Sequence, residues 1–165
     1  VSSCQTSRQG SKSADGKSLT ALIQPLGKNT VERTLTARED KRGAVTVTVS
    51  VKGLTPGLHG THIHSGATCG EDGKAAGPHW DPHATGKHGN PADPATVHHA
   101  ADIPNLVADA GGSGTMTFQT TNFKLTDLIG KTVVVHENPD NYMDTPANGG
   151  SGARIGCGVI GSAGY

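Results

Sequence analysis

Apolar and polar residues alternate along most of the chain from residue 19 onward. In the clearest run, Val45-Thr46-Val47-Thr48-Val49-Ser50-Val51, four valines fall on one face of a strand and hydroxyl groups on the other. Residues 115–120 repeat this pattern, with Met116 and Phe118 facing inward. A period of two predicts half-buried β-strands. The other predicted strands are residues 19–26, 31–38, 60–65, 106–110, 131–136 and 156–161.

Turn-forming residues separate the predicted strands. The runs Asp40-Lys41-Arg42-Gly43 and Asp109-Ala110-Gly111-Gly112 are typical of turns. The second is Gly-rich, but no helical pattern follows it, so a hairpin is favoured over a phosphate-binding loop. Only residues 126–129 suggest a helical turn. About eight short strands with such turns predict an all-β fold, an eight-stranded antiparallel Greek-key barrel or sandwich.

Two long segments do not fit the strand pattern. Residues 66–101 and 137–154 are rich in Gly, Pro, His and Asp. Loops of this length in a compact domain are usually functional. Residues 1–18 are rich in Ser, Lys and Gly without periodicity, which predicts a flexible tail or tether. The remaining residues, 19–165, are long enough for one domain with its own core.

The composition narrows the classes of function. Aromatic residues make up only 3% of the chain, and 14 Lys and Arg balance 14 Asp and Glu. A nucleic-acid-binding protein needs basic surface and aromatic stacking platforms, so no nucleic-acid partner is expected. No apolar run approaches the roughly 20 residues of a membrane-spanning helix.

Histidine is strongly enriched. The chain has nine histidines, and six of them fall between residues 59 and 88. The segment His62-Ile63-His64 lies on a predicted strand, where side chains two residues apart emerge on the same face. Taken alone, such a pair is more often surface-exposed than metal-binding. Further candidate ligands follow at His79, His88, His99, Asp102 and His136.

These side chains suit two kinds of metal site. Three histidines with one carboxylate suit a closed zinc site. A set of imidazoles with an open position suits copper, which can then cycle between two oxidation states.

Four segments, residues 53–64, 76–79, 134–137 and 152–161, together resemble the copper/zinc superoxide dismutase family, of the bacterial type. Residues 53–64 resemble its copper-binding strand, and Ala76-Gly77-Pro78-His79 resembles its bridging-histidine motif. Val134-Val135-His136-Glu137 resembles the segment with its fourth copper ligand, and residues 152–161 resemble its C-terminal signature. The resemblance runs from residue 19 to residue 161 with all motifs in one order.

This resemblance implies copper and zinc as cofactors. It implies disproportionation of superoxide to dioxygen and hydrogen peroxide at a redox-cycling copper, with His79 as the bridge between the metals. Family spacing places a zinc ligand three residues before Asp102, so His99 is chosen and His98 is expected to be an exposed neighbour. The implied copper ligands are His62, His64, His79 and His136, and the implied zinc ligands are His79, His88, His99 and Asp102.

Other residues receive roles from the same resemblance. Asp140 matches the carboxylate that links a copper-site imidazole to a zinc-site imidazole, and Arg154 matches the residue that attracts and orients the anion. His59 matches a structural histidine. Cys69 and Cys157 match the intrachain disulfide, a pairing that the three cysteines alone leave as one possibility.

The chain also departs from the family pattern. Residues 137–153 contain no lysine, although family members often place basic residues there or nearby to steer the anion. Lys74 and Lys87 are substitute candidates, with ordinary surface lysines as the alternative.

Location and assembly are two further expectations. A disulfide favours an oxidising compartment, so we expect an extracytoplasmic protein: periplasmic, lipid-anchored at the cell surface, or secreted. The opening Val1-Ser2-Ser3-Cys4 resembles a bacterial lipobox, and lipidation of Cys4 competes with a free cysteine in a tether. A homodimer is left open.

Two other classes of function compete with the enzyme. One is a non-catalytic copper/zinc-binding relative, such as a chaperone's dismutase-like domain or a carrier. The other is a structural sandwich stabilised by histidine-bound zinc. The presence of all seven implied ligands together with Arg154 favours the enzyme.

Overall fold

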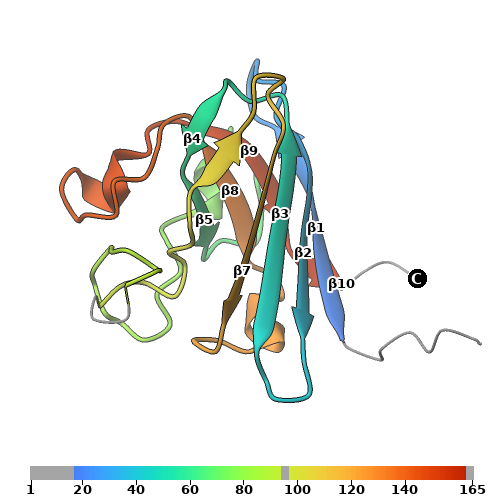
Figure 1. The fold of residues 1–165 in the computed structure, drawn as a ribbon, viewed down its shortest axis with the longest axis vertical. Coiled ribbons are helices and arrows are strands. Elements are labelled where there is room, and N and C mark those ends of the chain that lie inside the picture. Colours follow the sequence, from blue (N-terminus) through green and yellow to red (C-terminus); the bar gives the residue numbers. More distant parts are fainter. Residues whose placement is uncertain (1–16, 94–96, 163–165) are drawn as a thin grey trace, which may run out of the picture.

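Antiparallel strands form most of the regular structure in the computed structural model, which describes residues 17–93 and 97–162 (Figure 1). Three 3₁₀ helices, η1 (Lys74–Ala76), η2 (Leu125–Leu128) and η3 (Ala147–Gly150), lie in the connections. The strands are β1 (Ser18–Pro25), β2 (Glu32–Glu39), β3 (Val45–Lys52), β4 (Gly57–His59), β5 (Thr61–His64), β6 (Leu106–Ala108), β7 (Gly114–Thr120), β8 (Thr132–His136), β9 (Arg154–Val159) and β10 (Gly161–Ser162).

The strands form one large curled sheet and one small sheet. The order in the large sheet is β5-β8-β9-β1-β2-β3-β7, with β10 paired to β1, and the small sheet pairs β4 with β6. β4 leads into β5 through Gly60, and β6 packs beside β7, so the small sheet spans the gap between the two outer strands. Strands distant in sequence are thus neighbours, which confirms the predicted antiparallel Greek-key barrel.

The alternating pattern of β3 builds the core as predicted. Val45, Val47, Val49 and Val51 are at most 1% exposed, because one face of β3 is turned into the barrel. β3 pairs with β2 on one side and with β7 on the other. On β7, Met116 is buried and Phe118 is half-buried against the core cluster, so both face inward as expected.

Most predicted strands agree with the structure to within a few residues, but two strands were missed. β4 begins at Gly57, where φ is 116°, and this Pro-Gly segment looks like a turn in the sequence. β10 has only two residues, too few for a visible period.

The predicted helical turn at residues 126–129 is the 3₁₀ helix η2. Arg154, expected at the end of a loop, is the first residue of β9.

Both long loops extend from the same side of the barrel (Figure 1). The Cys69–Cys157 disulfide ties the first loop to β9 across a sequence separation of 88 residues, which confirms the expected pairing. Within the part of the chain that the structure covers, none of the helical turns has the length or apolar character to span a membrane. Cys4 and residues 1–16 of the expected tail lie outside the described residues, and Ser18 already belongs to β1.

Candidate metal centre

Strands β5 and β8 place three histidines on the loop side of the barrel. His62 and His64 alternate with Ile63, which is 1% exposed and packs in the core. The neighbouring β8 ends with His136. The first loop brings in a fourth histidine, His79, which forms an isolated bridge with His64. Alternation along β5 therefore directs apolar side chains inward and imidazoles toward the loops.

These four buried histidines form the first of two donor groups. One ring nitrogen of each of His62, His64, His79 and His136 lies within 4.8 Å of the others. Backbone carbonyls fix two of the rings. Nδ1–H of His64 donates to Gly77 at 2.8 Å, and Nδ1–H of His136 donates to the carbonyl of residue 152 at 3.2 Å. Both rings then direct Nε2 toward the group, free to bind a cation.

The second donor group surrounds one carboxylate oxygen. Oδ1 of Asp102 lies 3.5 Å from Nδ1 of His79, 2.6 Å from Nδ1 of His88 and 3.6 Å from Nδ1 of His99. By mutual distance alone, the second group of four is His62, His79, His88 and Asp102, with His99 at its edge. His62 and His79 belong to both groups, so the two groups are adjacent.

The predicted ligands leave buried atoms with no hydrogen-bond partner. Unpartnered buried polar atoms are rare in proteins, because each one costs roughly 1–3 kcal/mol. A cation would satisfy them, and neutral imidazole nitrogens and carboxylate oxygens are the donors that copper and zinc accept. The residues therefore fit both metals. The atoms are His62 Nδ1, His64 Nε2, His79 Nδ1, His88 Nδ1, His99 Nδ1, Asp102 Oδ1 and His136 Nε2. His88 Nδ1 and Asp102 Oδ1 face each other at 2.6 Å without the alignment of a hydrogen bond.

Burial keeps most of these rings neutral. It lowers the pKa of His79 to about 4 and the pKa of His136 to about 3, with further lowering by neighbouring histidines. Burial also lowers the pKa of His88, but the carboxylates of Asp102 and Asp140 outweigh it and raise this pKa to about 9. At neutral pH the rings of the first donor group, the predicted copper ligands, are therefore neutral and can bind a cation directly. His88 must first lose a proton.

Asp140 joins the two groups, as the resemblance implied. Nε2–H of His62 donates to its Oδ2 at 2.7 Å, and Nε2–H of His88 donates to its Oδ1 at 2.8 Å. The pKa of Asp140 lies well below its usual range, because these bonds outweigh the effect of burial. The side-chain amide of Asn105, which the sequence did not single out, holds the backbone of Asp140. It donates to the carbonyl of Asp140 and accepts from the N–H of Asp140, both at 2.9 Å.

Arg154, the first residue of β9, lies beside the first donor group, which is predicted to bind copper. Its Nη1 donates to the carbonyl of Gly73 and its Nη2 donates to the carbonyl of Gly77, both at 2.7 Å. The side chain is only half-buried, so part of the guanidinium remains accessible. Two of its five N–H groups are thus used to fix it, and the others can bind an anion.

Two other histidines have structural contacts. His59 is 2% exposed, and its ring nitrogens contact the carbonyl oxygens of His136 at 2.9 Å and Thr55 at 2.8 Å, as expected for a structural residue. His98 was expected to be exposed, and this was wrong. It is half-buried, and its Nδ1–H donates to the carbonyl of His99 at 2.6 Å.

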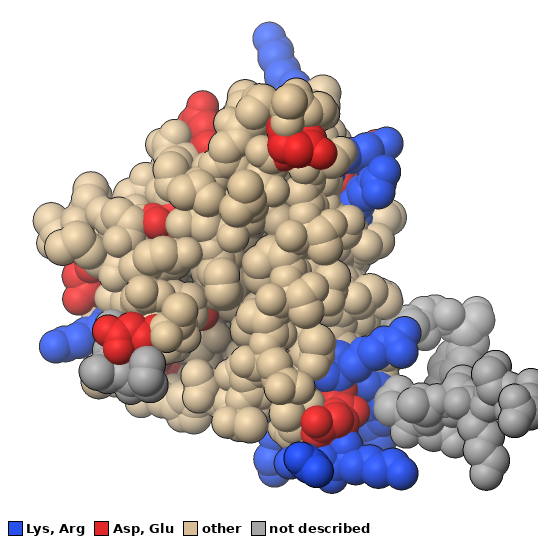
Figure 2. All heavy atoms as spheres, in the orientation of Figure 1, with Lys and Arg blue, Asp and Glu red and all other residues tan. Residues whose placement is uncertain are grey.

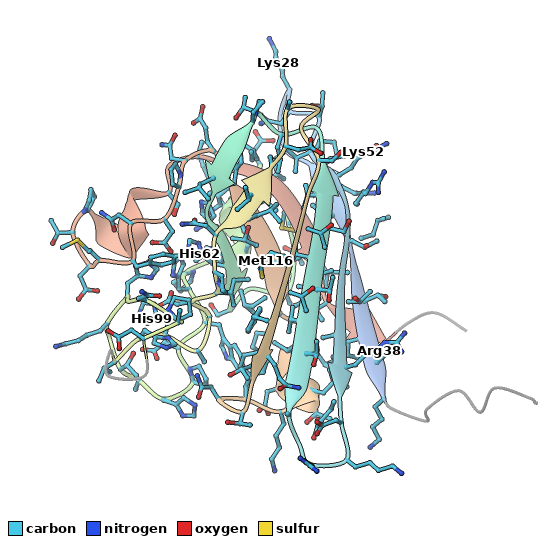
Figure 3. All side chains as sticks on the ribbon, viewed as in Figure 1. Lys28, Arg38, Lys52, His62, His99 and Met116 are labelled. Atoms are coloured by element: carbon cyan, nitrogen blue, oxygen red, sulfur yellow. A yellow bond between two sulfur atoms is a disulfide. The ribbon has the colours of Figure 1, made fainter. Side chains whose placement is uncertain are left out.

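Basic side chains visible in Figure 2 gather mainly at the end of the barrel that carries the β2–β3 hairpin. Lys41 and Arg42 lie in that turn. Figure 3 places Arg38 and Lys52 on the side of the barrel opposite His99. These residues do not flank the donor groups. The two lysines proposed for anion steering, Lys74 and Lys87, are both exposed in the first loop.

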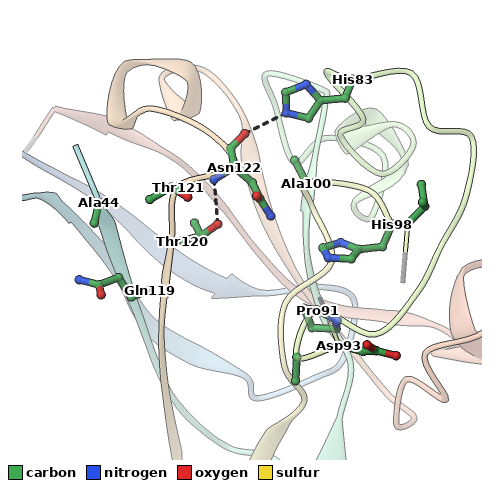
Figure 4. A pocket seen from close by; sticks show the side chains of 12 residues that line it. Ala44, His83, Pro91, Asp93, His98, Ala100, Gln119, Thr120, Thr121 and Asn122 are labelled. Carbon is green, nitrogen blue, oxygen red and sulfur yellow. Dashed lines mark hydrogen bonds between the residues drawn. The ribbon is translucent and has the colours of Figure 1, made fainter. Parts of the chain in front are cut away.

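A separate hollow of about 590 Å³ lies between the first loop and the end of β7 (Figure 4). His83, His98 and Gln119 are among the residues that line it, and His83 donates to the carbonyl of Asn122 at 2.9 Å. None of the proposed metal ligands lines this hollow, so it is not part of the metal centre.

Fold and site together define a class of protein: an antiparallel β-barrel with two adjacent, buried metal sites made of histidines and one aspartate. Residues 30–160 match the family model described as copper/zinc superoxide dismutase (SODC). The chain therefore belongs to the copper/zinc superoxide dismutase family.

Individual relatives agree with this assignment. A Cu-Zn superoxide dismutase of Photobacterium leiognathi is 40% identical over 136 residues, which is 77% of each chain. Cu-Zn superoxide dismutase 1 of Salmonella typhimurium (strain LT2) is 40% identical over 150 residues, covering 85% of this chain and 82% of that protein. Among solved structures, the clock protein EA4 superposes with a TM-score of 0.79 at 28% identity, covering 91% of this chain and 97% of that one.

Proposed function

We propose that this protein converts superoxide to dioxygen and hydrogen peroxide, using copper and zinc as cofactors. The observation that carries this proposal is the set of seven buried, unpartnered ligand atoms. Six belong to residues of the two adjacent donor groups, and that of His99 lies at the edge of the second. A histidine shared by both groups, His79, fits a bridged pair of metals. The two bacterial relatives, both named as Cu-Zn superoxide dismutases, support the same activity.

The tautomers support a division of the ligands between the metals. His62 belongs to both donor groups by distance, but its Nε2 is used by Asp140, so only Nδ1 can bind an ion. We assign it to copper. Zinc then takes the ligands whose Nδ1 atoms surround Asp102. The proposed copper ligands are His62, His64, His79 and His136, and the proposed zinc ligands are His79, His88, His99 and Asp102.

The protein's own residues would bind the anion and hold a proton. When bound, copper supplies one-electron redox chemistry, oxidising one superoxide and reducing the next. Nε2 of His79, on the copper side of the shared ring, is the atom at which a proton can be held for the product. Arg154 orients the anion with a guanidinium fixed by Gly73 and Gly77. We propose Lys74, directly after Gly73, as the better placed of the two steering lysines.

A superoxide-decay assay on metal-free protein reloaded with copper, zinc or both tests the function. We expect activity only when copper is present. His136→Ala should remove it, and His83→Ala should not, because His83 lies outside both donor groups. A fully metal-loaded protein without activity would instead support the non-catalytic copper/zinc-binding alternative. An active His136→Ala variant would disprove the copper assignment.

We also propose an extracytoplasmic location, periplasmic, lipid-anchored or secreted. The Cys69–Cys157 disulfide supports this, because such bonds persist in oxidising compartments. Cell fractionation tests the location, and lipid labelling of the protein and its Cys4→Ser variant tests the anchor.

A homodimer is a further proposal, to be tested by light scattering with the metals bound.

A further inference from the structure

His88 and His99, the two zinc-side histidines that are not shared with copper, have parallel surroundings. His88 directs Nδ1 toward Asp102 at 2.6 Å and Nε2 toward Asp140 at 2.8 Å. His99 directs Nδ1 toward Asp102 at 3.6 Å and Nε2 toward Oδ2 of Asp81 at 4.0 Å. Each ring thus has one nitrogen facing Asp102 and the other facing a second carboxylate. For His88 this is Asp140, at hydrogen-bond distance, and for His99 it is Asp81, at 4.0 Å and so beyond hydrogen-bond distance.

The carboxylate of Asp81 is fixed in place by its own loop. The hydroxyl of Thr85 donates to Oδ1 at 3.0 Å, and the backbone N–H of Gly86 donates to Oδ2 at 2.8 Å. These two bonds fix both carboxylate oxygens of Asp81. Its side chain is 17% exposed and that of His99 is 12% exposed, so water screens the pair only partly.

The backbone on either side of Asp81 is held as well. The N–H of Trp80 donates to the carbonyl of Ile63 on β5 at 2.9 Å, and the carbonyl of Trp80 accepts from the N–H of Ala101 at 3.2 Å. Asp81 is therefore anchored both to the strand that carries the copper-side histidines and to the segment that carries His99.

We propose that Asp81 is a positioning residue for zinc: its carboxylate accepts the Nε2–H of His99 and orients the ring so that Nδ1 binds the ion. Metal-bound histidines commonly donate their second N–H to a carboxylate, which fixes the tautomer and raises the basicity of the ligand. Asp140 already does this for His88. The inference rests on the proposed zinc set, in which His99 is a ligand.

A purely structural role for Asp81 makes a different prediction. If Asp81 served only to hold the turn at residues 81–86, loss of the Thr85 hydroxyl should matter as much as loss of the carboxylate charge. Asp81→Asn removes the charge facing His99 and, because the amide nitrogen cannot accept, one of the two turn hydrogen bonds. Thr85→Val also removes one turn hydrogen bond but keeps the charge and leaves Oδ2 unchanged.

Zinc affinity of the copper-free protein, measured by chelator competition, separates the two roles. We expect Asp81→Asn to raise the zinc Kd about tenfold and Thr85→Val to raise it less than about twofold. Circular dichroism of the metal-free variants checks that both fold. Equal losses in the two variants, or a Kd for Asp81→Asn within about twofold of the wild type, would overturn the proposal.

Nitrogen-15 NMR of the histidine rings gives a second, spectroscopic readout. In zinc-loaded wild type, the Nε2–H proton of His99 should be protected from exchange and shifted downfield, and this shift should be lost in Asp81→Asn but kept in Thr85→Val. A solvent-like, rapidly exchanging proton in the wild type refutes the role of Asp81. If His99→Ala instead binds zinc as the wild type does, the proposed zinc set itself is wrong, a separate outcome.

Discussion

The carboxylate of Asp144 accepts a 2.6 Å hydrogen bond from the backbone N–H of His88. The second loop therefore holds the backbone of a proposed zinc ligand that the first loop supplies. We expect Asp144→Ala to raise the zinc Kd about fivefold, the equivalent of roughly 1 kcal/mol for a partly exposed charge-assisted hydrogen bond. Chelator competition measures this.

Asp144→Asn is the matched control, because its amide oxygen can still accept the bond. Its zinc Kd should stay within about twofold of the wild type. If alanine and asparagine weaken zinc binding equally, the negative charge and not the hydrogen bond to His88 is the important property of Asp144.

Asp140 should matter more, because it contacts the rings of His62 and His88 at once. Asp140→Asn can accept from only one of the two N–H groups, so we expect zinc affinity to fall about 10–100-fold. Asn105→Ala, which removes only the backbone anchors of Asp140, should cause a smaller loss. Isothermal titration of zinc into both variants would show which contributes more to zinc affinity: the Asp140 carboxylate between the two rings, or the hydrogen bonds from Asn105 that hold its backbone.

Substitutions of Arg154 should lower the catalytic rate to different degrees. Arg154→Ala should lower kcat/KM for superoxide about tenfold at low ionic strength, and added salt should reduce the difference, because the charge acts on the approaching anion. Arg154→Lys keeps the charge but cannot donate to Gly73 and Gly77 with one planar fork, so we expect an intermediate rate. Pulse radiolysis measures these rates, and an alanine variant as fast as the wild type at low salt would contradict the assignment.

The metal-free protein should lose stability as the pH falls from about 6.5 to 4. The folded-state pKa values of His79 and His136, about 4 and about 3, lie below the ordinary value of 6.5. The unfolded chain therefore binds protons in this window and the folded chain does not. The loss is on the order of 3 kcal/mol per ring at pH 4.

His88 does not reverse this trend. Its raised pKa, about 9, gives a stabilisation that is complete below pH 6.5 and is lost only as the pH rises through 9. Urea unfolding followed by the fluorescence of Trp80, the single tryptophan, measures the stability. A free energy of unfolding that stays constant between pH 6.5 and 4 would show that these rings are already protonated in the folded protein.

Local pattern was enough to predict most of the barrel. The alternation along residues 45–51 specifies which face of the strand is buried, because side chains of a strand alternate strictly. β4 could not be predicted in this way, since Pro56 and Gly57 indicate a turn and its three residues are held by pairing with β6. Strand pairing depends on the whole sheet and leaves little trace in so short a segment.

At the site, the sequence motifs identified the predicted metal ligands but not the residues that hold these ligands in place. The resemblance named His99 and Asp102, and the structure brings both to the second donor group. Asp81, Asn105 and Asp144 carried no such signal. Their contacts join residues far apart in the chain, for example His88 with Asp144, so only the folded structure shows them.

The carbonyl oxygen of Gly77 accepts hydrogen bonds from both His64 and Arg154. One peptide group thus sets the orientation of His64, a proposed copper ligand, and of Arg154, the cation proposed to receive the substrate. A displacement of this peptide would move both groups together, so the coordination of the metal and the alignment of the incoming anion stay matched. Variation elsewhere in the first loop can then alter its surface without separating these two parts of the catalytic centre.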